Sequence, residues 1–191
     1  MKTSRLMLAA FAIVAAAQLV VPASLIVRQE RTLREGQVFK FKTAPVDPYD
    51  AFRGRYVALR FEQNSAPVAA GERFERGQRG YATVETGPDG FARFAAIGRT
   101  PPAGKPYLRV HALWSSGADV TLELPLDRYY MEEHLAPAAE RAYWQNNRRG
   151  QTNQNAYAMV RIRNGTGVIE NLYVAGKPIV ELARELSVKA Q

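Results

Sequence analysis

The chain of 191 residues carries a net charge of +8 and is 47% hydrophobic, which leaves room for one packed domain and a short additional segment. The absence of cysteine excludes disulfides and zinc sites built from thiolates, and the two histidines, His111 and His134, lack the spacing of a metal-binding helix. A basic chain can bind nucleic acid or lie against anionic lipid headgroups. Because the sequence has no RNP-like aromatic strand, zinc finger or basic helix, we expect no nucleic-acid binding.

The first segment with a clear pattern is an uncharged run of 22 residues from Leu6 to Val27. As a helix it would be about 33 Å long, which matches the hydrocarbon core of a bilayer. The pattern predicts a single transmembrane anchor within residues 1–27, in contact with membrane lipid over residues 6–27. A cleaved signal peptide is the alternative, with a cut near Ala15–Ala17. That cut would leave the rest of the apolar run on the mature end, so the uncleaved anchor is favoured.

The charges around this segment give opposing indications of its direction. Lys2 and Arg5 precede it, whereas Arg28, Arg31 and Arg34 follow it. A count of charges alone favours a domain that stays inside. The first helix usually follows its own short basic tail, however, and long domains cross largely regardless of charge. We therefore expect the domain on the periplasmic or extracellular side of a bacterial inner membrane.

The rest of the sequence predicts a mainly β (α+β) fold, a compact and mostly antiparallel domain with one inserted helix. Residues 28–37 fit a helical continuation or linker, residues 38–178 the domain, and residues 179–191 a tail or short amphipathic helix. Strand patterns alternate with turns rich in Gly, Pro and Asn. The predicted strands cover residues 38–43, 56–62, 81–86, 91–97, 106–114, 120–126, 156–163 and 168–175, and the inserted helix covers residues 131–144.

The alternation within these strands makes two specific predictions. A period of two residues puts Val57, Leu59 and Phe61 on one face, which we expect to be core. In the hairpin formed by the fifth and sixth predicted strands, the register would set His111 opposite Thr121.

The stretch from Asp47 to Phe61 carries a signature. Its residues read DPYDAFRGRYVALRF and resemble D-P-x-D-x-x-R-G-D-Y-x-x-L-x-Y, the signature of the GDYXXLXY family of bacterial membrane-anchored proteins. Arg55 stands where the family has Asp, which reverses a charge, and Phe61 stands where it has the last Tyr. The segment Arg128–Glu133 is similar to a second family segment, one of Arg, aromatic residues and an acid.

The resemblance implies an N-terminal membrane helix and a compact domain. It also implies an integral membrane partner, because such proteins are often encoded beside multi-spanning membrane proteins, but it implies no reaction. From the residues themselves, Asp47 and Asp50 fit a capped turn. The functional interpretation is a polar rim that binds a partner's loop or a lipid headgroup. The candidate binding residues are Asp47, Asp50, Arg53, Gly54, Arg55, Tyr56, Leu59, Phe61, Arg128, Tyr130 and Glu133.

No motif in the sequence is specific for catalysis, a cofactor or a metal, and we expect none of them. Glu132, Glu133 and His134 form the closest set of acid–base groups, but neighbours on a helix diverge by about 100° and do not converge on one substrate. We therefore expect an extracytoplasmic accessory or binding module. The alternative is a hydrolase distantly similar to type I signal peptidases, or an inactive relative. That enzyme class needs a serine just beyond the membrane helix, whereas the first serine after Val27 is Ser65.

Overall fold

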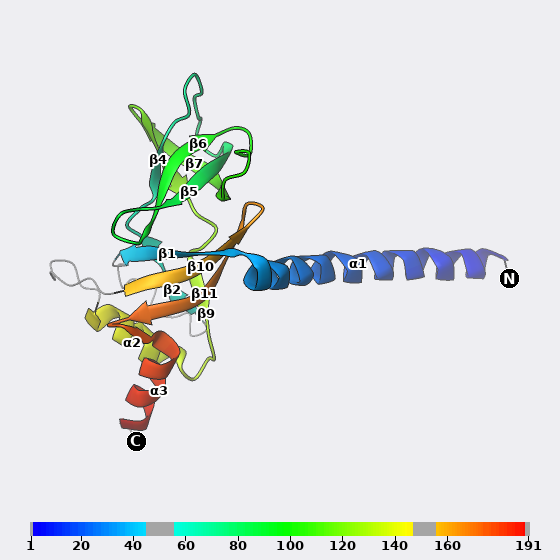
Figure 1. The fold of residues 1–191 in the computed structure, drawn as a ribbon. Coiled ribbons are helices and arrows are strands. Elements are labelled where there is room, and N and C mark those ends of the chain that lie inside the picture. The colour runs from blue at the N-terminus through cyan, green and yellow to red at the C-terminus, as the bar shows by residue number, and fades with distance from the viewer. Residues whose placement is uncertain (1, 45–55, 147–155, 190–191) are drawn as a thin grey trace.

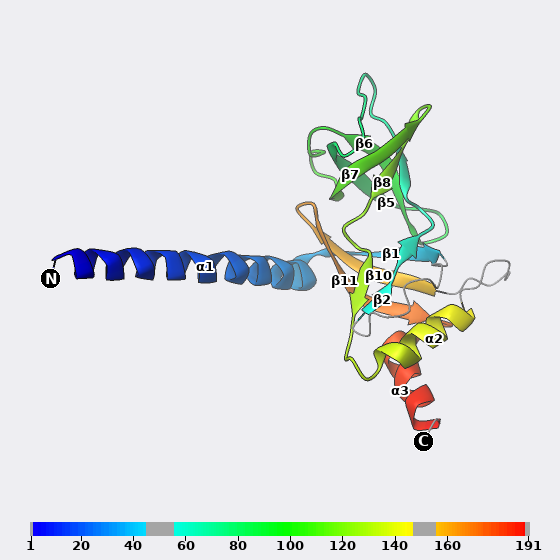
Figure 2. The ribbon, with the colours of Figure 1, turned by 180° about the vertical axis from the view of Figure 1, so that it is seen from behind.

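The computed structural model describes residues 2–44, 56–146 and 156–189 (Figure 1). One long helix, α1 (Lys2–Glu35), stands away from a body of β-sheets and two shorter helices. The long dimension of this body runs crosswise to α1, as the front and back views both show (Figures 1 and 2). If α1 crosses a membrane, the body extends sideways along the membrane surface.

The predicted anchor is part of α1. The stretch Ala10–Glu35 is long and apolar enough to cross a membrane, and its most apolar part is not buried against the rest of the chain. Pro22 lies inside the helix, and close by the Ser24 hydroxyl donates to the Val21 carbonyl at 2.7 Å. The residues predicted as a helical continuation or linker continue the same helix as far as Glu35, so α1 reaches the body without a break.

Over the described residues, the body consists of two five-stranded sheets and a two-stranded ribbon, in which neighbouring strands pair antiparallel. The central sheet has the order β12-β11-β10-β1-β3, from β1 (Gln37–Ala44), β3 (Arg60–Phe61), β10 (Ala156–Arg163), β11 (Thr166–Val174) and β12 (Lys177–Pro178). The upper sheet has the order β4-β8-β7-β5-β6, from β4 (Ser65–Pro67), β5 (Arg79–Thr86), β6 (Ala92–Gly98), β7 (Tyr107–Ser116) and β8 (Asp119–Glu123). The ribbon pairs β2 (Tyr56–Ala58) with β9 (Arg128–Tyr130).

The strand predicted around Leu59 is divided between the ribbon and the central sheet. Val57 pairs with Tyr129 in the ribbon, whereas Phe61 pairs with Thr43 of β1. The prediction of a shared buried face is confirmed, because Val57, Leu59 and Phe61 are 1%, 7% and 5% exposed. The prediction of one continuous strand is wrong, because the two ends of the segment pair with different partners.

The predicted register of the β7–β8 hairpin is wrong, by two residues at His111 and by three at Thr121. His111 lies opposite Glu123 rather than Thr121, and Thr121 instead pairs with Trp114. The turn holds two residues, the first of which is Gly117 at φ 64°. A β-bulge just before Trp114 adds one residue to β7. The turn is shorter than predicted, which shifts the pairing near it by three residues, and the bulge reduces that shift to two residues at His111.

Two helices complete the body. The inserted helix α2 (Ala136–Asn146) begins later than predicted, after a turn in which the Glu132 carbonyl accepts hydrogen bonds from the amides of Leu135 and Ala136. Glu132 and Glu133 therefore precede the helix and do not occupy its first turn. The C-terminal helix α3 (Ile179–Lys189) lies in the segment for which the sequence left a tail or a short helix open, and it packs against α2.

A continuous hydrophobic core joins the two sheets. Phe41 of the central sheet lies 5.7 Å from the ring of its neighbour Phe61 and 5.7 Å from the ring of Phe94 in the upper sheet, measured between centroids. At a second junction, the amide of Arg109 in β7 donates to the carbonyl of Gly165, in the turn between β10 and β11, at 3.0 Å. The sheets are thus held together through side chains and through backbone.

The end of α1 is fixed to the β10–β11 hairpin. Thr32 is 1% exposed, and its carbonyl accepts a hydrogen bond from the Gly36 amide at 2.9 Å. Arg163 at the end of β10 forms an ion pair with Glu35 at 2.8 Å. Nearby, Arg161 bonds both carboxylate oxygens of Glu170, at 2.8 and 3.0 Å. The Glu35–Arg163 ion pair, and a hydrogen bond from Arg161 to the Gly36 carbonyl at 3.4 Å, join the helix end to the central sheet. Gly36 alone lies between α1 and β1, so no flexible linker separates α1 from the body.

The tip of the β10–β11 hairpin provides a test of the second junction. Gly165 has φ 78°, and a Cβ there would stand 2.6 Å from a ring carbon of Tyr107 and 2.9 Å from Cγ of Arg109. Gly117 has φ 64° with open space around it. Both Gly→Ala changes bring strain of about 1–2 kcal/mol. Gly165→Ala adds overpacking of about 1–3 kcal/mol. We expect chemical unfolding of the full chain in micelles to show the larger loss for Gly165→Ala, and equal losses would contradict the packing argument.

Candidate functional site

The first half of the signature lies outside the described residues. Asp47, Asp50, Arg53, Gly54 and Arg55 all fall between β1 and β2, where the structure describes nothing. Their roles as a turn or as a binding rim therefore stay predictions. The described candidates begin at Tyr56, the first residue of β2.

The β2–β9 ribbon brings three of the predicted binding residues together. Tyr56 and Tyr130 are direct partners across the ribbon, and their ring centroids lie 5.6 Å apart in an edge-to-face arrangement. The guanidinium of Arg128 lies 5.0 Å from the centroid of the Tyr56 ring, within the range of a cation–π contact. We call Tyr56, Arg128 and Tyr130 the aromatic–arginine cluster.

The electrostatics of this cluster keep its arginine charged. The hydrogen bond with Tyr130 raises the pKa of Arg128, and the nearby Asp127 carboxylate, at 3.4 Å, raises it further. Tyr130 is 64% exposed, so the cluster presents an aromatic ring and a fixed cation to solvent. Between Arg128 and Tyr130, the half-buried Tyr129 points the other way, and its hydroxyl lies 3.3 Å from the Asn171 amide oxygen. Burial raises the pKa of Tyr129.

The remaining described candidates lie apart from the cluster. Leu59 and Phe61 are buried, so these signature positions contribute to the core and not to a binding surface. Glu133 is exposed in the turn before α2. Its neighbour Glu132 lies 3.5 Å from His134 and 3.7 Å from Arg184, which are exposed ion pairs of small energetic weight.

The serines that a hydrolase could use are placed unfavourably for that role. Ser65 is exposed on β4, at the edge of the upper sheet. The hydroxyl of Ser115 donates to the Phe74 carbonyl at 2.9 Å, and that bond does not activate the oxygen as a nucleophile. Among the described residues, no group of three or more acids and histidines is placed to hold a metal ion.

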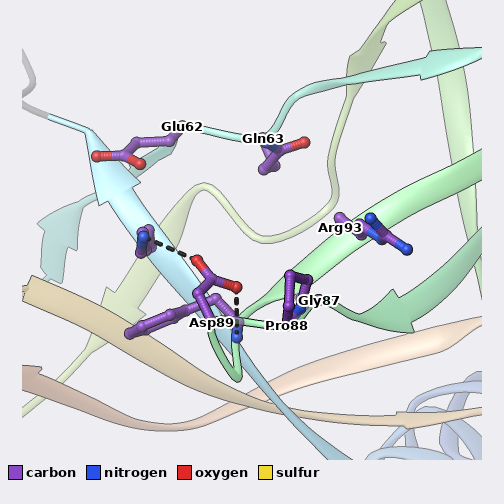
Figure 3. Close-up of a pocket in the computed structure, with 9 residues that line it drawn as sticks. Glu62, Gln63, Gly87, Pro88, Asp89 and Arg93 are labelled. Atoms are coloured by element: carbon purple, nitrogen blue, oxygen red, sulfur yellow. Dashed lines mark hydrogen bonds and ion pairs between the residues drawn. The ribbon is translucent and has the colours of Figure 1, made fainter.

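A hollow that the sequence did not predict lies between β1, the residues after β3 and the β5–β6 turn. It has a volume of about 380 Å³. Figure 3 shows Glu62 and Gln63 on one side, Gly87, Pro88 and Asp89 on the other, and Arg93 at one end. Its lining residues are Lys42, Glu62, Gln63, Gly87, Pro88, Asp89, Phe91, Ala92 and Arg93.

An ion pair forms part of the wall of this hollow. The Lys42 ammonium lies 2.9 Å from a carboxylate oxygen of Asp89 and 4.7 Å from the centroid of the Phe91 ring. The Phe91 ring in turn meets Tyr157 edge-on, at 5.8 Å between centroids, and Tyr157 stacks on Tyr173 at 5.0 Å. Because the lining carries both signs of charge, it suits a polar segment with its own charges of both signs better than a polyanion.

The Lys42–Asp89 pair predicts a specific pH dependence. The hydrogen bond from Lys42 lowers the pKa of Asp89, and the Phe91 amide lowers it further. A carboxyl group with a lowered pKa stabilises the fold above its unfolded value, about 3.9, and loses that contribution as the pH falls through the folded pKa. Asp89→Asn should therefore lower the melting temperature slightly at pH 7, and this difference should shrink as the pH falls below about 3.9. A wild-type advantage that stays constant as the pH falls would contradict this assignment, and Asp119→Asn, which changes an exposed acid at the start of β8, is the control.

Comparison with known proteins identifies the family. The chain matches the family model described as "GDYXXLXY protein" over residues 18–172. The chain belongs to the GDYXXLXY family. The matched range contains the second half of α1, the upper sheet, the ribbon, α2 and the central sheet apart from β12 and the end of β11, so the GDYXXLXY match covers the aromatic–arginine cluster and the hollow together. None of the curated proteins and none of the solved structures gives a match.

Proposed function

We propose that this GDYXXLXY-family protein is a membrane-anchored accessory module that binds an integral membrane partner through the aromatic–arginine cluster. The observation that carries the proposal is the exposed pairing of Tyr130 with an arginine held over Tyr56. Tyrosine and arginine are enriched among the residues that dominate binding energy at protein interfaces. The apolar helix α1 supplies the anchor that keeps this surface beside membrane proteins.

The cluster is organised before any partner binds. Arg128 is held between the Tyr56 ring and the Asp127 carboxylate, so less side-chain entropy is lost when it meets a partner. Tyr130 has only two side-chain torsions and is fixed on a strand. A surface of this kind favours a polar, partly aromatic face on the partner, such as an extracytoplasmic loop.

We place the body on the extracytoplasmic side of a bacterial inner membrane. Support comes from Lys2 and Arg5, which precede the apolar run and favour a cytoplasmic N-terminus. The chain has no native cysteine, so a single Glu75→Cys change would report the side cleanly. A membrane-impermeant maleimide should label this variant in intact cells. Labelling only after permeabilisation would contradict the proposed orientation.

A photo-crosslinking amino acid at position 130 tests the partner surface. Trp114 provides a matched control, because it is 68% exposed against 64% for Tyr130 and lies on β7 of the upper sheet, away from the ribbon. We expect a discrete adduct with a membrane protein from position 130 and not from position 114. The double variant Arg128→Ala/Tyr130→Ala should lower recovery of that protein about tenfold or more, since each truncated residue of a binding centre costs about 1–2 kcal/mol or more. A protein that purifies alone from mild detergent, without an adduct at position 130, would refute the proposal.

A further inference from the structure

The outer face of the upper sheet is basic and aromatic. On β5 and β7, Arg79 lies opposite His111, Tyr81 opposite Arg109, and Thr83 opposite Tyr107. The residues between them, including Gly80, Ala82, Leu108 and Val110, are buried, so the alternation leaves the named pairs on the side away from the core, where Thr83 is covered and only 8% exposed. We define the outer face as Arg79, Tyr81, Tyr107, Arg109 and His111.

The composition of this face is unlike that of an ordinary solvated sheet. Tyr81 and Tyr107 meet edge-on, with ring centroids 5.6 Å apart, and both are partly exposed. Arg79 and Arg109 supply two cations. Two acids lie on the same side of the sheet and each has a basic neighbour: the Glu123 carboxylate is 4.0 Å from His111, and Glu85 on β5 forms an ion pair with Lys105 at 3.5 Å. Tyrosine rings have an apolar body and a polar end that suit the headgroup level of a membrane, and arginine forms paired hydrogen bonds with phosphate.

The outer face lies close to the end of α1. Glu35 of α1 pairs with Arg163, the last residue of β10. Two residues further on, Gly165 at the hairpin tip packs against the side chains of Tyr107 and Arg109. Figures 1 and 2 show this hairpin tip on the side of the body from which α1 leaves. A short chain of contacts therefore connects the helix end to the outer face.

The length of α1 sets the height of the body above the bilayer. The uncharged run ends at Val27, and the following eight residues as far as Glu35 rise about 12 Å as a helix. The headgroup layer on each side of the hydrocarbon core is roughly 5–7 Å thick. Membrane helices are also tilted by about 20° on average, which lowers one side of a body that extends sideways. The upper sheet extends sideways from α1 in this way (Figure 2).

We infer that the outer face lies on the membrane crossed by α1 and binds the phosphate groups of anionic phospholipids through Arg79 and Arg109. Tyr81 and Tyr107 then lie among the headgroups. This inference rests on the proposed function only in requiring that α1 spans the membrane, and it involves a different surface from the aromatic–arginine cluster. Lipid contact on the outer face fixes the direction in which the cluster is presented.

A fluorophore placed on the outer face tests this contact. Because the chain has no native cysteine, His111→Cys provides one labelled position, and Glu181→Cys on α3, which lies on the side of the body away from the N-terminal end of α1 (Figure 1), provides the control. Full-length protein is reconstituted in nanodiscs of phosphatidylcholine, with or without about a third phosphatidylglycerol, and with a nitroxide on a fraction of the headgroups. We expect phosphatidylglycerol to increase quenching at position 111 severalfold and to leave position 181 unchanged.

Charge variants separate specific binding from general attraction. Arg79→Gln/Arg109→Gln should return quenching at position 111 to its level in pure phosphatidylcholine, and Arg79→Lys/Arg109→Lys, which keeps the charge but loses the paired hydrogen bonds, should retain only a minor part of the increase. The control Arg76→Gln/Arg141→Gln removes the same charge from exposed positions elsewhere and should have little effect.

The outcomes that overturn the inference are distinct from those that overturn the proposed function. If position 111 is quenched equally in both lipid mixtures, or as weakly as position 181, the outer face does not bind anionic lipid, while the proposed function stands. If position 111 becomes protected only when other membrane proteins are added, the outer face is a protein interface and the lipid assignment is wrong. If the chain does not enter nanodiscs through α1, both proposals fail.

Discussion

Phe41→Ala is expected to lower the free energy of unfolding by about 3–5 kcal/mol, the usual cost of removing a buried phenylalanine ring. Phe41 is 1% exposed and meets both Phe61 of its own sheet and Phe94 of the upper sheet. Its removal leaves a cavity where the two sheets join. Since domains of this size are stable by about 5–15 kcal/mol, this one change would remove a large part of the stability.

Chemical unfolding of the full chain in micelles, followed by near-ultraviolet circular dichroism, measures this effect. Phe91→Ala is the matched control, because Phe91 is half-buried at the hollow and contacts Lys42 and Tyr157 instead of the core. We expect a loss for Phe91→Ala less than half that for Phe41→Ala. Equal losses would show that the sheets do not depend on the Phe41 junction.

Two arginines in the middle of α1 should release the protein from the membrane. Ala16 and Ala17 lie at the centre of the uncharged run, where each arginine disfavours insertion by about 2.5–3.5 kcal/mol. The double variant Ala16→Arg/Ala17→Arg is therefore disfavoured by about 5–7 kcal/mol, enough to reverse the partition of a marginal segment. Fractionation with carbonate extraction should move the variant from the pellet to the supernatant.

The control for this experiment keeps the position and changes the chemistry. Ala16→Leu/Ala17→Leu should remain in the membrane pellet, because leucine favours insertion. An arginine variant that resists carbonate extraction as the wild type does would show that the body, and not α1, holds the protein in the membrane.

The residues within each turn were enough to predict where two of the hairpins turn. Asn164 and Gly165, with φ 50° and 78°, form the tight turn between β10 and β11 that the Asn-Gly pair favours. Likewise, Gly90 at φ 78° closes the predicted turn between β5 and β6. Each of these turns depends on residues that are adjacent in the sequence, so their positions can be read from the sequence.

The division of the strands into two sheets depends on distant partners. Nothing near Val57 indicates that it pairs with Tyr129, or that Phe61, four residues later, joins β1. The β7–β8 register failed for a related reason, since a bulge before Trp114 has no clear marker in the sequence. The fold class was therefore predictable, whereas the sheet order was not.

The candidate functional sites were likewise predictable only in part. The family signature pointed to Tyr56 and to the segment with Arg128 and Tyr130, and the structure brings these three side chains together. The hollow could not be predicted, because its ion pair joins Lys42 to a residue 47 positions further along the chain. The strands predicted over residues 81–86 and 91–97 place Asp89 in a turn and indicate nothing about its partner. The hollow is formed by residues that are far apart in the sequence. Only the β5–β6 turn, which makes one side of it, could be recognised from the sequence.

Helix α1 continues into the body without a break, which couples the orientation of the body to the rotation of the helix. Glu35 and Gly36 contact Arg163 and Arg161 of the β10–β11 hairpin, so we expect the helix and the body to turn together. Turning α1 in the bilayer by the spacing of one residue, about 100°, swings the upper sheet through the same angle around the membrane normal. A neighbouring membrane helix that packs against one side of α1 would therefore also determine the direction, parallel to the membrane plane, in which Tyr130 points.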